Sequence, residues 1–536
     1  MKRCIAIVNK TRNYVQRNGW KKAFKRGINE IYEQTRRTGR YMTWRKLNAP
    51  KPAELDTVKQ AAADSGIRIQ YVSDIGQLQQ ALRMPDTGSQ YIGIVHPADM
   101  LEPYATEYCQ AYLAKHPDTD LLYTDEDSYT TEGESQIIYA NPVLKPDFNL
   151  DMLRSRNYLG GLVLIRTQFL RQVLPSLHTP KEASGEYDLY LRCIEQTKAV
   201  RHLPRILYHR QGRPVQEAKH NEAILDAHYE RMGIPATAEY DAVTGMYRTH
   251  YHWEETPLVS INIPNKDHID DLSTCVESIL KQTTYPNIEI VIIENNSTEQ
   301  QTFDYYEKLQ KRDARIRVIT WKDAFNYAAI TNFGVKHSKG EYILLMNNDV
   351  EVIEPDFIQE MLGFVQRSDV GICGARLLYF DDTIQHAGVI VGLGGICGEA
   401  FQGIPQEDGG YDNRIFTTQD YSAVTAACLM TKKSVFEAVG GMDEDLIVAY
   451  NDIDYCLRVR ALGKLVVYNP YALLHHYEYK SRGLENTKAK LERYNREVDI
   501  FTARHREMIE KGDPYYNRNL TRRYKDFSLR RVELFK

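Results

Sequence analysis

The stretch YILLMNNDVE, residues 342–351, runs from apolar to polar within ten residues. Four apolar residues and a Tyr lead directly into Asn347, Asn348 and Asp349. A short apolar run that ends in polar residues is typical of a buried strand. Ligands of open α/β sheets bind beyond the carboxyl ends of the strands. We therefore expect these three polar side chains to lie in a binding site.

The residues before this stretch alternate between predicted strands and helices. LVSINIPN (258–265) and YPNIEIVIIENNS (285–297) are apolar runs that end in polar residues, as strands do. The segments 270–283 and 324–338 are predicted helices, the first from apolar residues at helical spacing. Such alternation predicts the α/β class, with a doubly wound, mostly parallel sheet.

Segments of the first half of the chain recur in the second half. IRIQYVSDIGQLQQAL (67–82) is similar to IRVITWKDAFNYAAIT (316–331), and YIGIVHPADMLEP (91–103) is similar to YILLMNNDVEVIEP (342–355). GEYDLYLR, from residue 185, is likewise similar to NDIDYCLR, from residue 451. Repeats of this kind predict two copies of one Rossmann-like domain. We expect four regions: a basic helical segment (1–49), a first domain (50–245), a complete second domain (257–485), and a C-terminal helix and tail (486–536).

Composition excludes several classes of protein. The 536 residues are 43% hydrophobic and 26% charged, as in a soluble globular protein. The net charge of −4 does not indicate a protein that binds nucleic acid through an overall positive charge. Eight Cys without a CxxC pair argue against a zinc site and fit a reducing cytosol. No apolar run looks long enough to span a bilayer. Residues 1–46 carry fourteen Lys and Arg, which fits either a helix packed on the next domain or peripheral contact with anionic lipid.

Acidic residues and histidines follow several of the predicted strands. Asp349 suits a hard divalent cation, and Glu294 suits hydrogen bonds to a ribose or base, although both could be turn residues. Asp452 opens a predicted helix behind the loop GGMDED, where it could be a general base or a helix-capping acid. His475 and His476 end another apolar strand and could bind metal or be structural.

Six segments, which occur in order over 257–483, resemble a known family: VSINIPNKD, YPNIEIVIIENNS, YILLMNNDVEV, TAACLMTKKSVFEAVGGMDE, YNDIDYCLR and HHYEYKSRG. They resemble the inverting glycosyltransferases of family 2, which have the GT-A fold. The resemblance is strongest to bacterial enzymes of surface-polysaccharide assembly, including O-antigen rhamnosyltransferases.

This resemblance implies a role for each matching residue. The nucleotide-sugar site would be formed by Pro264, Asn265, Glu294, Asn347 and Asn348, with Glu294 on the nucleoside. Asn347 and Asp349 match the two ends of the DxD metal motif, and His475 or His476 matches a late His that can complete the metal site. Asp452 matches the catalytic base. The sequence departs from the family pattern at Asn347 and at Asn451, where the family has acids; the first departure should weaken metal binding.

The resemblance also implies an activity. The chain would move a sugar, rhamnose or another hexose, from a nucleotide-diphosphate sugar to a growing cell-surface glycan. It would need a divalent cation, Mg²⁺ or Mn²⁺. Its acceptor would be lipid-linked, so we expect a cytoplasmic protein at the inner face of the membrane, in contact with it through the basic N-terminus.

The first copy has lost some of these residues. In the alignment His96 replaces Asn347, Ala98 replaces Asp349 although Asp99 is adjacent, and Glu186 replaces Asp452. His209 takes the place of the late His pair. We interpret this copy as a degenerate glycosyltransferase-like domain that serves as a scaffold or acceptor-glycan site.

Three alternatives remain open. Both halves could be active, or the chain could be a non-catalytic protein that binds glycans or nucleotides, as Asn347 and Asn451 would suit. An oxidoreductase would depend on GLGGICG (392–398), which does not lie between a first strand and a helix and is therefore a weak dinucleotide motif.

Overall fold

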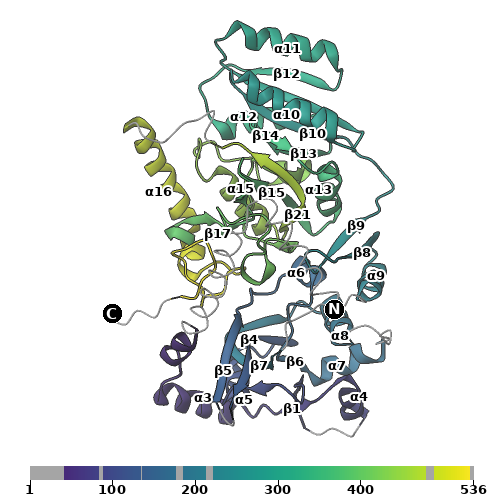
Figure 1. Cartoon of the computed structure of the whole chain (residues 1–536), viewed down its shortest axis with the longest axis vertical. Coiled ribbons are helices and arrows are strands. Elements are labelled where there is room, and N and C mark those ends of the chain that lie inside the picture. Colours follow the sequence, from purple (N-terminus) through teal and green to yellow (C-terminus); the bar gives the residue numbers. More distant parts are fainter. Residues whose placement is uncertain are drawn as a thin grey trace.

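The computed structural model describes residues 41–83, 88–133, 136–176, 185–212, 221–478 and 488–530. Figure 1 shows two domains, each built on one large sheet. The predicted α/β class with two domains is confirmed. Most of the basic segment predicted over 1–49, and the end of HHYEYKSRG, lie outside the described residues. In the ranges above, no helix is both long and apolar enough to cross a membrane.

The first domain contains a mixed sheet with the strand order β1-β2-β6-β4-β7-β3, and β5 pairs with β4. Its strands are β1 (Ile69–Val72), β2 (Tyr91–Ile94), β3 (Met100–Leu101), β4 (Leu121–Glu132), β5 (Gln136–Val143), β6 (Val163–Arg166) and β7 (Val200–Gln211). Its helices are α3 (Pro52–Ser65), α4 (Ile75–Arg83), α5 (Ala105–Lys115), α6 (Leu150–Ser155), α7 (Thr167–Val173), α8 (Gly185–Gln196) and α9 (Glu222–Arg231). A hairpin of β8 (Ala236–Asp241) and β9 (Met246–Tyr251) follows and leads to the second domain.

The second domain has a larger sheet with the order β12-β11-β10-β13-β20-β15-β21-β14, and its first four strands are parallel. Its main strands are β10 (Val259–Asn265), β11 (Ile288–Asn295), β12 (Ile316–Trp321), β13 (Tyr342–Met346), β14 (Val350–Val352), β15 (Val370–Leu378), β20 (Cys428–Lys432) and β21 (Leu465–His476). Short strands are β16 (Ile384–His386), β17 (Val389–Val391), β18 (Cys397–Glu399) and β19 (Gln419–Asp420). Its helices are α10 (Ile269–Gln282), α11 (Gln300–Arg312), α12 (Tyr327–His337), α13 (Phe357–Gln366), α14 (Lys433–Ala438), α15 (Asn451–Ala461) and α16 (Lys488–Lys511).

The two sheets share one strand order. The order β1-β2-β6-β4-β7-β3 corresponds to β10-β13-β20-β15-β21-β14, and each pair of neighbours has the same relative direction in both. Within residues 41–251, no described strand corresponds to β11 or β12. By local sequence β1 matches β12, but it pairs directly with β2 and so occupies the sheet position of β10. The first sheet therefore has fewer strands on the side where β11 and β12 lie in the second sheet.

Strand β13 lies in the interior of the second sheet, and none of its residues is more than 4% exposed. Leu344 and Met346 pack with residues of α10 and α13 on one face. Ile343 and Leu345 pack with residues of α12 and α15 on the other face. A strand that is covered on both faces needs a continuous apolar sequence, which explains YILLM.

Buried polar contacts join the two domains. Arg367 donates to Asp151 at 2.5 Å, and both side chains are at most 3% exposed. The Asp151 N–H in turn donates to Asp420, and burial beside Asp151 raises the pKa of Asp420 well above its ordinary value. The segment after α16 crosses between the domains, where Asn517 donates to Asp125 at 3.0 Å and to the Lys145 carbonyl at 2.9 Å.

Candidate active site

The polar corner after β13 is a tight turn, held by two neighbouring strands. The Asn347 N–H donates to the carbonyl of Ala427, just before β20, at 3.1 Å. The Tyr477 N–H, just after β21, donates to the carbonyl of Asp349 at 2.9 Å. Asp349 is only 5% exposed. The backbone thus fixes the carboxylate at the carboxyl end of the sheet, as the sequence predicts.

His476 faces this corner. Its Nε2 lies 3.3 Å from Asp349 Oδ1 and 3.3 Å from Asn347 Nδ2. His475, the preceding residue of β21, contacts Asp382 instead, at 2.9 Å. Successive side chains of a strand point to opposite faces, so only one of the two can reach the corner. The structure therefore brings His476, and not His475, to Asp349.

The corner can be tested for its fit to a divalent cation. The described residues contain no group of three or more His, Cys, Asp or Glu side chains that could hold a metal. Asp349 and His476 supply one carboxylate and one imidazole at close range. Mg²⁺ is typically held by one or two carboxylates together with substrate phosphates and water. The two side chains fit a cation that binds together with a diphosphate, rather than one held by the protein alone.

The ends of β10 and β11 lie next to this corner. Asn265 accepts a hydrogen bond from Asn348 at 2.7 Å, and in the sheet it is paired with Glu294. Pro264, the residue before Asn265, is only partly buried. The predicted nucleotide-side residues Pro264, Asn265, Glu294 and Asn348 are therefore neighbours.

Glu294 is 2% exposed, and its oxygens are already hydrogen-bonded. They accept from the Ser297 N–H at 2.6 Å, from the Ser297 hydroxyl at 2.5 Å and from the Tyr306 hydroxyl at 2.7 Å. Burial, together with the contact with Glu294, raises the pKa of Tyr306, so the phenol stays protonated and donates. Glu294 thus fixes the turn at the strand end, which is the alternative that the sequence left open beside contact with a nucleoside.

Asp452 lies in the first turn of α15 and is partly exposed. Its Oδ2 accepts from the Ala426 N–H at 3.0 Å, and its Oδ1 accepts from the Ile453 N–H at 2.9 Å. The side chain of Asn451 accepts from the Asp452 N–H at 2.7 Å and donates to two loop carbonyls. Asn451 therefore acts as a local brace, which an amide can do and a carboxylate cannot.

One short segment, residues 425–427, connects Asp452 with the corner after β13. The N–H of Ala426 bonds Asp452, and the carbonyl of Ala427 bonds Asn347. The Tyr327 hydroxyl also lies 3.3 Å from the side-chain oxygen of Asn347 and 3.5 Å from the Ala426 carbonyl. Sequence reasoning missed Tyr327 and Ala426, because neither residue type signals a site on its own.

The first domain arranges the corresponding residues differently. His96 Nε2 bonds Glu186 Oε1 at 3.0 Å, so the counterparts of Asn347 and Asp452 contact each other. His209 is buried between Asp127 at 2.5 Å and Glu102 at 2.8 Å.

The pairing register also corrects the alignment of this domain. Met100 pairs with His209 as Val350 pairs with His476. The counterpart of Asp349 is therefore Asp99, and the prediction of Ala98 was wrong. One extra residue between Tyr91 and Met100, compared with the segment from Tyr342 to Val350, caused the error.

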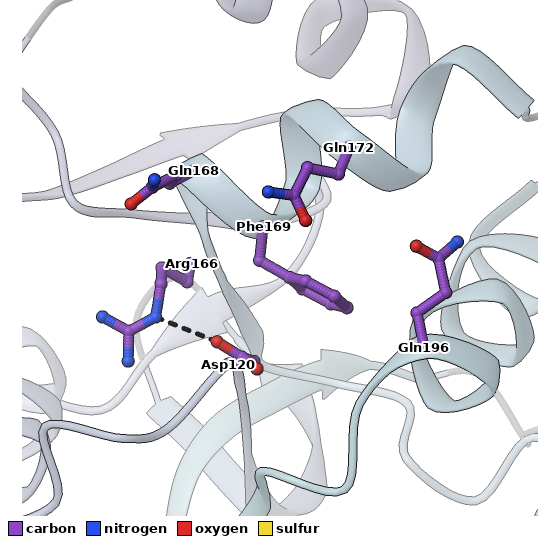
Figure 2. A pocket seen from close by; sticks show the side chains of 6 residues that line it. All are labelled: Asp120, Arg166, Gln168, Phe169, Gln172 and Gln196. Carbon is purple, nitrogen blue, oxygen red and sulfur yellow. Dashed lines mark hydrogen bonds and ion pairs between the residues drawn. The ribbon is translucent and has the colours of Figure 1, made fainter.

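A separate hollow of about 330 Å³ lies on the first domain (Figure 2). It is lined by Asp120, Arg166, Gln168, Phe169, Gln172 and Gln196. Arg166, which bonds Asp120 at 3.0 Å, pairs with Tyr91 at the start of β2. The hollow therefore lies at the opposite end of the strands from His96 and Glu186.

One family model matches part of the second domain, and two curated relatives match most of the chain. Residues 260–440 match the family model "Glycosyl transferase family 2". The uncharacterized protein y4gI of Sinorhizobium fredii is 38% identical over 485 residues, which cover 88% of this chain and 53% of the relative. The O-antigen biosynthesis protein RfbC of Myxococcus xanthus is 35% identical over 492 residues, which cover 88% of this chain and 37% of the relative. The chain thus spans about half or less of the length of these relatives.

Two solved structures are also similar to part of this chain. The mannosyltransferase PcManGT from Pyrobaculum calidifontis, in complex with GDP-Man and Mn²⁺, has 14% identity and a TM-score of 0.36, over 47% of this chain and 65% of that chain. GalNAc-T7 with UDP, GalNAc and Mn²⁺ has 15% identity and a TM-score of 0.40, over 50% of this chain and 52% of that chain.

The family match covers the corner after β13 and ends before Asp452, His475 and His476. It begins in β10 and ends just after α14. The second domain of this chain therefore contains a glycosyltransferase family 2 domain, over residues 260–440.

Proposed function

We propose that the chain is an inverting, metal-dependent glycosyltransferase that moves a sugar from a nucleotide-diphosphate sugar to a growing cell-surface glycan. The match over 260–440 supports the transferase class, and the relative named O-antigen biosynthesis protein supports the glycan. The observation that carries the proposal is the shared segment 425–427, which is hydrogen-bonded both to Asp452 and to the Asn347–Asp349 corner.

The donor would bind at the ends of β10, β11 and β13. The linked side chains of Asn265 and Asn348 would border the nucleotide, and the turn that Glu294 fixes would contact the nucleoside. Asp349 and His476 would hold a Mg²⁺ or Mn²⁺ ion, which when bound neutralises charge on the diphosphate. His475 would not contact the ion, because its ring bonds Asp382 instead.

Asp452 would be the general base. Its carboxylate accepts the proton of an acceptor hydroxyl while that oxygen forms a bond to the anomeric carbon and the bond from that carbon to the diphosphate oxygen breaks. The nucleotide diphosphate leaves with the bonding electrons. Because one displacement occurs, on the face opposite the leaving group, the anomeric configuration inverts.

The donor sugar would be rhamnose or another hexose, and the acceptor would be lipid-linked. The protein would therefore work in the cytoplasm at the inner face of the membrane, with the basic residues of 1–46 against anionic lipid. The first domain would be a scaffold or acceptor-glycan site, since the bond between His96 and Glu186 occupies the groups that a second reaction would need.

A donor screen tests this proposal. The full chain, with Mn²⁺ or Mg²⁺, would be incubated with a panel of nucleotide-diphosphate sugars and extracted lipid-linked glycans, and release of nucleotide diphosphate would be measured. We expect release with one donor and loss of release in Asp452→Asn. Tight nucleotide binding without turnover of any donor would instead support a binding protein.

A further inference from the structure

The turn that leads into α15 has an unusual backbone. Tyr450, the residue directly before this helix, has a φ of +65°, in the left-handed region that a side chain with a Cβ seldom adopts. Such residues persist only where surrounding contacts hold them, and they concentrate at functional sites. Asp452 follows two residues later, so the conformation of Tyr450 sets the direction of the proposed base.

Some of the contacts that hold this turn come from α16; others come from Asn451 and from α12, where the Tyr327 N–H donates to the Ile447 carbonyl at 2.9 Å. Glu497 is 0% exposed, and its two carboxylate oxygens accept from the N–H groups of Val448, at 3.2 Å, and Ala449, at 2.9 Å. These N–H groups precede α15 and take no part in the hydrogen bonds within that helix. A buried carboxylate is retained only where it is bonded, and here both of its oxygens bond the turn.

The ring of Tyr450 is held by the same helix. Its hydroxyl bonds the hydroxyl of Tyr494 at 2.7 Å, and its ring stacks on that of Phe501 with centroids 5.0 Å apart. Tyr494, Glu497 and Phe501 lie three or four residues apart, so they form one face of α16. That face meets the turn at a side chain and at two backbone groups.

Further along, α16 is fixed to the body of α15. Asp454, which is fully buried, accepts from Arg504 at 2.7 Å and from His505 at 2.8 Å. Asp454 also bonds Arg458 within α15 at 2.7 Å. The helix is therefore anchored to α15 independently of Glu497, so loss of the Glu497 contacts should loosen the turn without detaching the helix.

We propose that α16 is part of the catalytic unit, with Glu497 as a positioning residue that holds the 446–450 turn and thereby aims the Asp452 carboxylate at the acceptor hydroxyl. This inference rests on the proposed function. It assigns a role to a segment that lies beyond the residues matched by the family model.

The test uses Glu497→Gln in the full chain. The amide keeps the shape of the side chain, but one of its two ends is now a donor that faces an N–H group. We expect kcat to fall about 10- to 100-fold, since small misplacement of a reacting group costs this much, while the KM for the donor stays within about twofold. Glu492→Gln, on the exposed side of α16, is the matched control and should change neither.

A double variant separates positioning from a general structural effect. If Glu497 acts through Asp452, adding Glu497→Gln to Asp452→Asn should cost no more than about twofold further, because residues that act as a unit are not additive. A full additional loss in the double variant would overturn the proposal. If Glu497→Gln does not fold, Tyr494→Phe removes only the hydroxyl contact, and it should show a smaller loss of kcat with the same lack of additivity.

Hydrogen exchange gives a readout that needs no activity. The amides of 446–453 should exchange faster in Glu497→Gln than in wild type, while the amides of α10 stay unchanged. Unchanged exchange in the turn would overturn the role of Glu497 even in an active enzyme. Faster exchange, with no transfer by wild type from any donor, would instead refute the proposed function and leave the structural hold intact.

Discussion

The two domains use the same six-strand order but differ at the carboxyl ends of their strands. In the second domain, Asp452 is partly exposed and its carboxylate accepts from two backbone N–H groups. In the first domain, Glu186, at the corresponding helix start, bonds the side chain of His96. The helix itself is preserved, since Asp188 and Arg192 repeat the pair formed by Asp454 and Arg458. The difference teaches that the fold can be retained after the ionisable groups of a site have paired with one another.

The edge of the sheet differs as well. In the second domain β10 and β11 end beside the corner and contribute Asn265 and Glu294. The described part of the first domain has no strand that corresponds to β11 or β12. A nucleotide would therefore lack one side of its site in the first domain.

The test with the largest expected effect removes the corresponding carboxylate from each domain in turn. Asp349→Ala should lose at least about a thousandfold in transfer rate, because the cation and the diphosphate lose their carboxylate. EDTA should have the same effect on wild type. Asp99→Ala, the matched change in the first domain, should stay within a few fold. Release of nucleotide diphosphate measures all three, and full activity in EDTA would reject the metal-dependent mechanism.

The second test compares the two helix starts. Asp452→Asn should lose at least about a hundredfold in kcat, as is typical when a general base is removed, with nucleotide affinity nearly unchanged. Glu186→Gln should leave kcat within a few fold. Steady-state kinetics and calorimetric titration with nucleotide diphosphate would measure these effects. The reverse pattern would place the active site in the first domain.

A third test uses acid. Strand β4 buries Asp125, Glu126 and Asp127, whereas the corresponding strand β15 buries Leu377 and Leu378. Burial raises the pKa of Glu126, but Lys145 and Arg210 outweigh it and lower the pKa to about 2. A lowered pKa stabilises the fold above the unfolded value of 4.5, and this stability is lost as the pH falls from there through about 2.

Glu126→Gln should therefore lower the free energy of unfolding at pH 7 by about 2 kcal/mol, since burial also lowers the pKa of Lys145 and reduces the net gain of the pair. Its stability should also vary less between about pH 4.5 and 2. Urea unfolding at several pH values would measure this, with Glu132→Gln, on the exposed end of β4, as the control. Equal acid sensitivity of variant and wild type would contradict the prediction that Glu126 contributes stability that is lost in acid.

The smallest expected effect separates the two histidines. His476→Ala should raise the Mn²⁺ concentration needed for half-maximal activity by about tenfold or more. His475→Ala should change it by about twofold at most, because its ring bonds Asp382. Activity titrated with Mn²⁺ would measure both. A larger effect at His475 would show that the strand end rearranges when donor binds.

Much of this arrangement could be predicted, because β13 and its neighbours are continuous apolar runs that end in polar residues. The repeat was visible because YDLYLR and DIDYCLR keep the same helix and the same internal ion pair. The position of β1 could not be predicted, because pairing with β2 and not local sequence decides which place a strand takes in a sheet. The side on which His475 and His476 lie depends on strand register, which one sequence does not give. The roles of Glu497 and Tyr306 were hidden because each depends on contacts between separate elements.

The bond between Asn517 and Asp125 has a consequence for biosynthesis. The two residues are 392 positions apart, and Asp125 is buried in the first domain. At a synthesis rate of about 5–20 residues per second, Asn517 is made roughly 20 to 80 s after Asp125. During that time Asp125 has His202 and the Lys145 N–H as partners but lacks this amide. The first domain is thus translated before the second, yet the hydrogen bonds of its buried Asp125 are complete only after the segment beyond α16 has been made.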